Sequence, residues 1–230
     1  MGFPRCFKHV IFMGSPGVGK GTYARLAAPI LQFGHVSPGD LLRATPNPEI
    51  QTSLSRGELV PEQTVFATIE LELNRLREDA NLKGAILDGF PRSVSQAKNW
   101  LINRVKPDLI IEFKLPQYIL VQKLLGRRIC SYCGSLFNVF DFVNEEYKMP
   151  AMKPKIGGVC DTCSGTLVQR TDDTHDIITS RLKMHNESHE ELVEFVKKQT
   201  DNFLEFNVKT GIAQMPELID AIQNHLQINK

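Results

Sequence analysis

Residues 10–22 have the sequence VIFMGSPGVGKGT, and this stretch decides the fold. Four consecutive apolar residues are typical of a buried parallel strand. The glycines that follow let several backbone N–H groups surround an anion at the start of a helix, where the helix dipole also favours negative charge. Lys20 stands where its side chain would reach the terminal phosphates of a nucleotide. We therefore predict a phosphate-binding loop, and a turn without a ligand is the weaker alternative.

The loop departs from the strict phosphate-loop motif in one place. That motif has Ser or Thr directly after the lysine to hold magnesium, whereas this chain has Gly21 there and the hydroxyl follows at Thr22. The pattern Gly-x-Pro-Gly-x-Gly-Lys-Gly-Thr at residues 14–22 resembles the nucleoside monophosphate kinases, and adenylate kinase above all.

Length and charge limit the classes of protein to consider. The 230 residues suit one domain with insertions. The 27 Lys and Arg balance 26 Asp and Glu, so we expect no binding to nucleic acid. No apolar run approaches the ~20 residues that cross a bilayer. We expect a monomeric cytoplasmic protein, with a mitochondrial location left open. Lipidation at Gly2 is not expected, because Cys6 stands where the myristoylation signal has Ser or Thr.

Apolar runs separated by helical patterns predict a parallel five-stranded sheet, doubly wound, with helices on both faces. Strands are expected at residues 9–13, 35–37, 85–87, 109–113 and 206–208. Helices are expected from Lys20 to a point before Pro29, from Pro61, after Pro116, over 172–184 and 187–203, and over a final stripe from Met215 to Leu226. Within one domain, 1–230, we expect a short mobile acceptor-binding excursion at 44–60 and a lid insertion at 127–170.

A second motif follows the third expected strand. Residues 88–92 are Asp-Gly-Phe-Pro-Arg, and Gln96 comes one helical turn later. This order and spacing again resemble adenylate kinase. The resemblance implies that Arg92 binds the phosphate of the acceptor nucleotide and that Gln96 hydrogen-bonds its adenine.

Phosphoryl transfer needs dense positive charge around two phosphate chains. The resemblance places the catalytic cations at Lys20, Arg92, Arg127, Arg170 and Arg181, with Arg43 on the acceptor side. Asp88, Asp172 and Asp173 would hold the hydration shell of Mg²⁺, although a helix-capping role is the alternative, especially for Asp172.

The resemblance also implies the remaining contacts of each nucleotide. Lys123 stands where the family has an arginine stacked on the donor base, Asn138 replaces a frequent histidine of the lid, and Pro38 replaces a threonine beside the acceptor base. These departures keep GTP open as a donor and leave the acceptor less certain. The implied donor contacts are Gly17, Val18, Gly19, Lys20, Gly21, Thr22, Lys123, Arg127, Leu136, Phe137 and Ala213, and the implied acceptor contacts are Pro38, Arg43, Glu58, Leu59, Val60, Gly89, Phe90, Pro91, Arg92, Gln96, Arg170 and Arg181.

Four of the five cysteines form two Cys-x-x-Cys pairs, Cys130 with Cys133 and Cys160 with Cys163. Two such pairs are typical of a four-thiolate zinc site. We expect a structural Zn²⁺ that stiffens the lid, as in many members of the family. A nucleic-acid-binding zinc ribbon is the weaker reading, because the segment lacks a basic and aromatic face. The extra lid residues 144–154 have no assigned role.

The sequence thus predicts a phosphotransferase that passes the terminal phosphoryl group of Mg-ATP to AMP, giving two ADP. Two alternatives remain: a kinase of the same fold that uses GTP or another donor or acceptor, and a nucleotide-regulated binding protein whose zinc insertion holds a partner.

Overall fold

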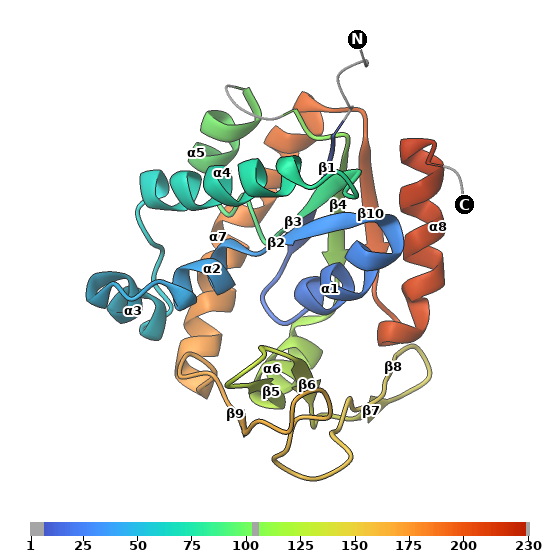
Figure 1. Ribbon diagram of the computed structural model, residues 1–230. Coiled ribbons are helices and arrows are strands. Elements are labelled where there is room, and N and C mark those ends of the chain that lie inside the picture. The colour runs from blue at the N-terminus through green and yellow to red at the C-terminus, as the bar shows by residue number, and fades with distance from the viewer. Residues whose placement is uncertain (1–6, 103–105, 229–230) are drawn as a thin grey trace.

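A five-stranded parallel sheet forms the centre of the computed structural model, which describes residues 7–102 and 106–228 (Figure 1). Its strands lie in the order β10-β4-β1-β3-β2, so the phosphate-loop strand β1 occupies the middle. The predicted doubly wound sheet is confirmed. The strand bounds are β1 Lys8–Gly14, β2 Phe33–Val36, β3 Gly84–Asp88, β4 Leu109–Lys114 and β10 Phe203–Asn207.

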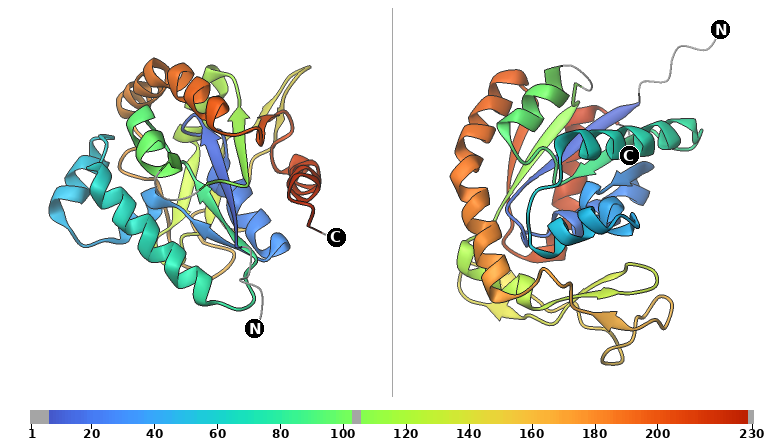
Figure 2. Two further views of the ribbon diagram at one scale, coloured as in Figure 1. Left: turned by 90° about the horizontal axis from the view of Figure 1, so that it is seen from above. Right: turned by 90° about the vertical axis from the view of Figure 1, so that its left-hand side faces the viewer.

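Alternate residues of each strand belong to two different hydrophobic cores, because successive side chains point to opposite faces of the sheet. On β1, Val10 and Phe12 pack with α1 and α8, whereas Ile11 and Met13 pack with α4, α5 and the C-terminal half of α7. The helices accordingly lie on both faces of the sheet (Figure 2). Their bounds are α1 Lys20–Leu31, α4 Glu62–Glu78, α5 Val94–Ala97 with the π-helical turn η1 Lys98–Ile102, α7 His175–Gln199 and α8 Met215–Leu226.

Residues 38–55 form two short helices, α2 Pro38–Ala44 and α3 Pro48–Ser55. Ser37 and Asn47 cap them, each followed by proline at the first helical position. The part we expected to be only a polar excursion is therefore helical, and it is tied to the second core through Ile50, which is 8% exposed.

Three boundary predictions are wrong. Helix α1 does not end before Pro29 but continues to Leu31. The proline lies in the last turn, so its missing N–H costs only one hydrogen bond there, and Leu31 is buried in the first core. The two helices expected over 172–203 are one helix, α7, which begins at His175, because no strong helix breaker separates residues 184 and 187.

The third error concerns Phe203, which was placed at the end of that helix. It begins β10 instead, where it pairs with Ile110 of β4, so the last strand lies over Phe203–Asn207 rather than 206–208. Pairing with the neighbouring strand overrides the local helical pattern.

The lid follows α6 Gln117–Leu125 and lies below the carboxyl ends of the sheet (Figures 1 and 2). It contains an antiparallel sheet of order β6-β5-β9 and a separate hairpin, β7–β8. The 3-10 turn η2, Gly211–Gln214, leads into α8. The lid strands are β5 Arg127–Cys130, β6 Leu136–Asn138, β7 Phe142–Val143, β8 Lys148–Met149 and β9 Leu167–Val168.

Among the described residues, no helix is long and apolar enough to cross a membrane. The lipidation prediction at Gly2 and the lone Cys6 fall outside the residues that the structure describes.

Candidate active site

The phosphate loop joins β1 to α1 through glycines that no other residue could replace without strain. Gly14 has φ 127°, and a Cβ atom there would lie 2.3 Å from the carbonyl oxygen of Phe113 on β4. Gly19 caps α1 with φ 115°. These conformations are open to glycine and strained for other residues. The loop therefore turns its backbone tightly at the carboxyl end of the central strand, as the sequence predicted.

Lys20 lies over this loop. Its ammonium donates hydrogen bonds to the carbonyl oxygens of Gly14, at 2.8 Å, and Ser15, at 2.9 Å. Burial lowers the pKa of Lys20 to about 8, since desolvation disfavours the charged form, and only Asp88 opposes this. A phosphate anion at the loop would favour the protonated amine. The side chain of Lys20 is therefore suited to binding an anion.

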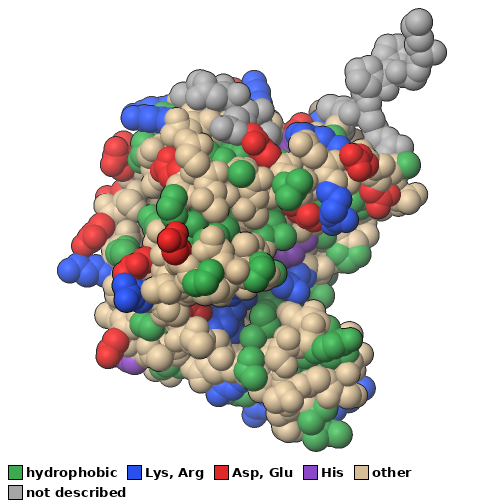
Figure 3. All heavy atoms as spheres, turned by 60° about the vertical axis from the view of Figure 1, so that its left-hand side comes forward, with side chains coloured by type: hydrophobic (Ala, Val, Ile, Leu, Met, Phe, Trp, Pro, Cys, Tyr) green, Lys and Arg blue, Asp and Glu red, His purple; other side chains and the backbone are tan. Residues whose placement is uncertain are grey.

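One continuous cavity extends from the phosphate loop in two directions. On one side it reaches Arg43, Leu59 and Arg92, which come from the acceptor segment and the end of β3. On the other side it passes Lys123 and Asn138 and reaches Gly211 in η2. Figure 3 shows Lys and Arg side chains gathered in the hollow between the lid and the body of the molecule. The cavity lining thus contains residues predicted for the acceptor side and residues predicted for the donor side, with Lys20 among them.

Buried aspartates hold the arginines of this cavity in place. Asp172 accepts hydrogen bonds from Arg43, at 3.0 Å, and from Arg181, at 2.8 Å. Asp173, which is 1% exposed, binds Arg127 through two hydrogen bonds of 2.7 and 2.5 Å. Such two-point pairs fix the plane of a guanidinium group. The arginines are thus oriented before any substrate binds.

Asp40 forms a third pairing centre, which the sequence analysis missed. It lies within 2.9 Å of Arg25 on α1, 2.8 Å of Arg170 at the end of the lid and 3.6 Å of Arg43. Burial alone would raise the pKa of Asp40, but the three guanidinium groups together lower it. Its place in the first turn of α2, close after the carboxyl end of β2, was the available signal.

Burial also lowers the pKa of Arg170 and of Arg181 to about 10 each, with repulsion from Arg127 adding to the effect in both. Desolvation is the largest cause in both cases, and the neighbouring aspartates oppose the shifts. A bound polyphosphate would supply further negative charge to these cations.

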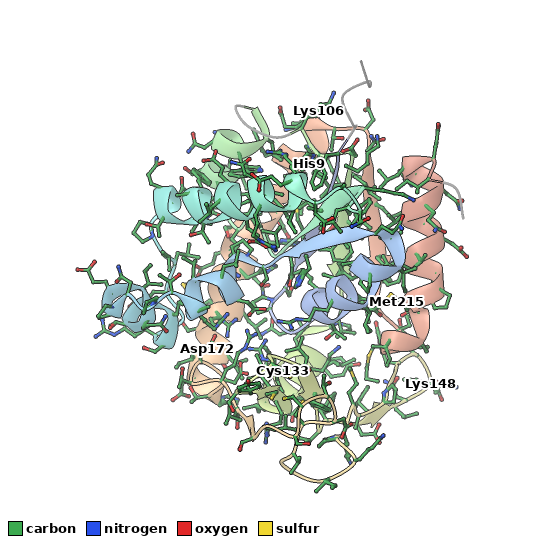
Figure 4. The ribbon with its side chains drawn as sticks, in the orientation of Figure 1. His9, Lys106, Cys133, Lys148, Asp172 and Met215 are labelled. Atoms are coloured by element: carbon green, nitrogen blue, oxygen red, sulfur yellow. The ribbon has the colours of Figure 1, made fainter. Side chains whose placement is uncertain are left out.

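Most predicted site residues line the cavity, and the others lie outside its lining, either buried or, like Glu58 and Ala213, exposed. Gln96 is 3% exposed, and its amide oxygen accepts a hydrogen bond from the backbone N–H of Arg92. Phe90 packs against Phe66 and Trp100 in the second core. Figure 4 labels Asp172 between α7 and the acceptor helices. The predicted residues that line the cavity are Gly17, Gly19, Lys20, Gly21, Thr22, Arg43, Leu59, Asp88, Gly89, Pro91, Arg92, Lys123, Arg127, Leu136, Phe137, Arg170 and Arg181, and those outside its lining are Val18, Pro38, Glu58, Val60, Phe90, Gln96, Asp172, Asp173 and Ala213.

Two histidines of α7 also line the cavity and were not predicted. His189 hydrogen-bonds at 2.6 Å to Glu112, a 3% exposed carboxylate of β4, and stacks on His185 at a ring distance of 4.3 Å. Burial and the neighbouring His189 lower the pKa of His185 to about 4, so this ring is neutral at pH 7. The spacing of four residues from Arg181 to His185 puts both on one face of the helix.

The four paired cysteines meet within the lid, where Figure 4 labels Cys133. All four sulfur atoms lie within 4.8 Å of one another, and the closest pairs are Cys130 with Cys163 at 3.4 Å and Cys133 with Cys160 at 3.6 Å. Sulfurs that bind one Zn²⁺ at about 2.3 Å in a tetrahedron lie at comparable distances from one another. These four residues could hold a zinc ion.

A phosphate loop that shares one cavity with a second group of arginines suits phosphoryl transfer between two nucleotides, which places the protein among the P-loop nucleotide kinases. The family model of adenylate kinase matches residues 12–201. The chain is also 32% identical over 229 residues to the GTP:AMP phosphotransferase of Plasmodium falciparum (isolate 3D7), covering 96% of this chain and 98% of that one.

Two bacterial relatives also support this class of protein. An adenylate kinase of Borrelia turicatae (strain 91E135) is 37% identical over 195 residues, with 82% of this chain and 86% of the relative covered. One from Fervidobacterium nodosum is 35% identical over 205 residues, with 85% and 88% covered. The chain therefore belongs to the adenylate kinase family. It is a nucleoside monophosphate kinase, a phosphotransferase.

Proposed function

We propose that the protein transfers the terminal phosphoryl group of Mg-ATP to AMP and releases two ADP. The observation that supports this most is the single cavity, in which Lys20 separates the donor side from Arg43 and Arg92 on the acceptor side. Arginines oriented by Asp172 and Asp173 would stabilise the charge of the transferring group without reorganising, which lowers the barrier. No group of the protein needs to form a covalent bond to phosphate.

Magnesium would neutralise charge on the phosphates of the donor. Asp88 fits a role in its hydration shell, since this carboxylate lines the cavity next to Gly21 and lies 3.4 Å from His35. Asp172 and Asp173 are engaged by arginines, so we assign them to the outer part of that shell and to orienting the cations.

GTP is a second candidate donor. The relative from Plasmodium falciparum is named for the use of GTP with AMP, and it matches nearly the whole of this chain. The side chain at the donor end, Lys123, also differs from the arginine that the resemblance leads one to expect.

We further propose one structural Zn²⁺ bound by the four lid cysteines. The four sulfur atoms lie within 4.8 Å of one another, which fits four thiolates around one tetrahedral ion. A closed set of four thiolates leaves no open position for catalysis, so the metal would stiffen the lid only.

The segments 44–60 and 127–170 would act as the acceptor-binding part and the lid of one domain. The monomeric state, the cytoplasmic location and the lack of nucleic-acid binding stay predictions from the sequence. The alternative of a regulated binding protein with a zinc-supported partner surface is tested by the same assay as the proposal.

That assay measures ADP formed from ATP and AMP, first with this pair and then with GTP or ITP as donor and GMP or CMP as acceptor. We expect turnover with ATP and AMP that depends on Mg²⁺. Nucleotide binding without turnover would contradict the proposed reaction and favour the binding protein.

A further inference from the structure

The lid contains a hairpin, residues 141–152, to which neither motif assigns a role; we call it the tongue. It consists of β7 and β8 joined by a turn, in which Asn144 accepts hydrogen bonds from the backbone of Glu146 and Tyr147. At its base, Met152 exchanges two backbone hydrogen bonds of 2.8 and 3.0 Å with Asn138 of β6. The tongue is therefore an ordered extension of the lid sheet.

The tip of the tongue reaches the body of the molecule. The backbone N–H of Lys148 donates a 2.7 Å hydrogen bond to the carbonyl oxygen of Lys209, just before η2. Met149 beside it is 3% exposed and belongs to the first core. Figure 4 shows Lys148 on the tongue below the foot of α8, where Met215 begins that helix. The tongue thus connects the lid to the body at a second point, in addition to the chain connection from α6 to β5.

This contact closes one end of the cavity. From the phosphate loop the wall runs through Tyr23, whose hydroxyl donates a 2.5 Å hydrogen bond to the carbonyl oxygen of Gly211. A Cβ atom on Gly211 would lie 3.8 Å from the sulfur of Met149 and 3.9 Å from Pro150. Met149, Pro150 and Met152 line the cavity on the side of the tongue. This end is continuous with the loop that would hold the donor phosphates.

The polar side chains at this end are already engaged. The amide of Asn138 donates to the carbonyl oxygen of Lys123 at 2.9 Å and accepts from the backbone of Phe140 at 2.9 Å. The ammonium of Lys123 lies 3.4 Å from the carbonyl oxygen of Val18, toward the phosphate loop. The side chains with which the tongue lines this end are apolar: the thioethers of Met149, which is 3% exposed, and Met152, and the ring of Pro150. A planar base is the part of a nucleoside triphosphate that such a surface suits.

We propose that the tongue is the outer wall of the donor-base site and that it retains the base of the nucleoside triphosphate by apolar burial, without discriminating among purines. This rests on the proposed function, because the ligand is its donor substrate. The phosphate loop holds the triphosphate, and the tongue adds affinity for the base only.

The test is a calorimetric titration of the donor alone, with no acceptor present, using ATP, GTP and inorganic tripolyphosphate as three probes. In Met149→Ala combined with Met152→Ala, we expect Kd for ATP and for GTP to rise about fivefold or more, because buried apolar contact is lost. Kd for tripolyphosphate should stay within about twofold of the unchanged protein, since that ligand has no base.

Three further variants make the result of this titration interpretable. Ile156→Ala, on the same lid but 66% exposed and outside the cavity lining, should leave all three Kd values unchanged. Met149→Leu together with Met152→Leu keeps apolar volume and should restore binding close to that of the unchanged protein. If the Ala variant proves too unstable, Met152→Ala alone, which removes no core residue, should weaken ATP and GTP and spare tripolyphosphate.

Unchanged nucleotide affinity in the Ala variants would overturn the inference, and so would equal weakening of tripolyphosphate. A shift in the ATP to GTP affinity ratio of more than about threefold would show that the tongue reads the base, contrary to the proposal. Failure of the unchanged protein to make ADP from ATP and AMP would instead overturn the proposed function, and the two failures are measured separately.

Discussion

The two ends of the cavity are built in opposite ways. At the phosphate centre, Asp172 and Asp173 pair with three arginines around Lys20, so the wall is made of fixed charges. At the tongue, methionines and a proline form the wall, and the nearby polar side chains are engaged. On the proposed function, the two ends would have different tasks: the oriented charges would serve phosphoryl transfer, which is common to all triphosphates, and the apolar wall would retain the base. Changes at the first end should alter turnover, and changes at the second should alter affinity.

The largest expected effect on this comparison is that of Lys20→Ala at the phosphate centre. We expect turnover to fall about a hundredfold or more, because a charge placed before the reaction is removed from the phosphate centre. The melting temperature should change little, since Lys20 hydrogen-bonds only to carbonyl oxygens of its own loop. Lys155→Ala, at an exposed lid position, is the matched control. Near-normal turnover in Lys20→Ala would contradict the phosphate-loop assignment.

Asp173→Asn tests whether the charges of the phosphate centre are held by the aspartates. This side chain is fully buried and pairs with Arg127, so the substitution leaves a buried guanidinium without its counter-charge. We expect the free energy of unfolding in urea to fall by about 3 kcal/mol. Asp176→Asn, fully exposed in the first turn of α7, should lower it by less than about 1 kcal/mol. Equal behaviour of the two variants would show that the pairing does not order the site.

The charge of Lys20 also makes donor binding depend on pH. Its pKa of about 8 is below the ordinary lysine value, so raising the pH through 8 removes the charge that binds phosphate. We expect KM for the donor to rise about tenfold between pH 7 and 9. The same group makes the folded state more stable as pH rises from 8 to about 10.5, because the unfolded chain then holds more protons. A Lys20→Arg variant with the same pH profile would contradict the assignment to Lys20.

Removal of zinc should affect the lid and spare the chemistry. Metal analysis of reduced protein should give one Zn²⁺ per chain, and chelation should lower the melting temperature by about 5 °C, because metal binding stabilises the folded segment. Turnover at 25 °C should stay within about twofold, since a four-thiolate site has no catalytic position. Metal analysis that finds no zinc in the purified, reduced protein would refute the site. A total loss of turnover at 25 °C after chelation would refute its purely structural role.

The smallest expected effect concerns base preference. An apolar donor end predicts a narrow spread of kcat/KM across ATP, GTP and ITP with AMP fixed. A wider spread should appear across AMP, GMP and CMP with ATP fixed, because a site that hydrogen-bonds a base rejects an analogue that leaves its groups unpaired. Gln96 is 3% exposed, lies outside the cavity lining and accepts a hydrogen bond from the backbone of Arg92, so its contact with the acceptor base stays a prediction from the sequence. The opposite order of the two spreads, at one magnesium concentration, would contradict the contrast between the two ends.

The sequence by itself determined the features that depend on neighbouring residues. The phosphate loop follows from glycines at 14, 17 and 19, whose backbone conformations are local, and the parallel sheet follows from short apolar runs separated by helical patterns. The two Cys-x-x-Cys pairs likewise indicated where a metal could bind, and the structure brings them together.

Tertiary structure alone decided what the charged and apolar side chains do. Asp172 meets Arg43 across 129 residues of sequence, and Asp40 meets Arg170 across 130. The tongue is held against the body by its backbone hydrogen bond to Lys209, which lies some 60 positions further along the chain. Such contacts have no local pattern, because they arise only when the sheet brings distant segments to one edge. The same reason explains the error at Phe203, where pairing with β4 outweighs the helical preference of its neighbours.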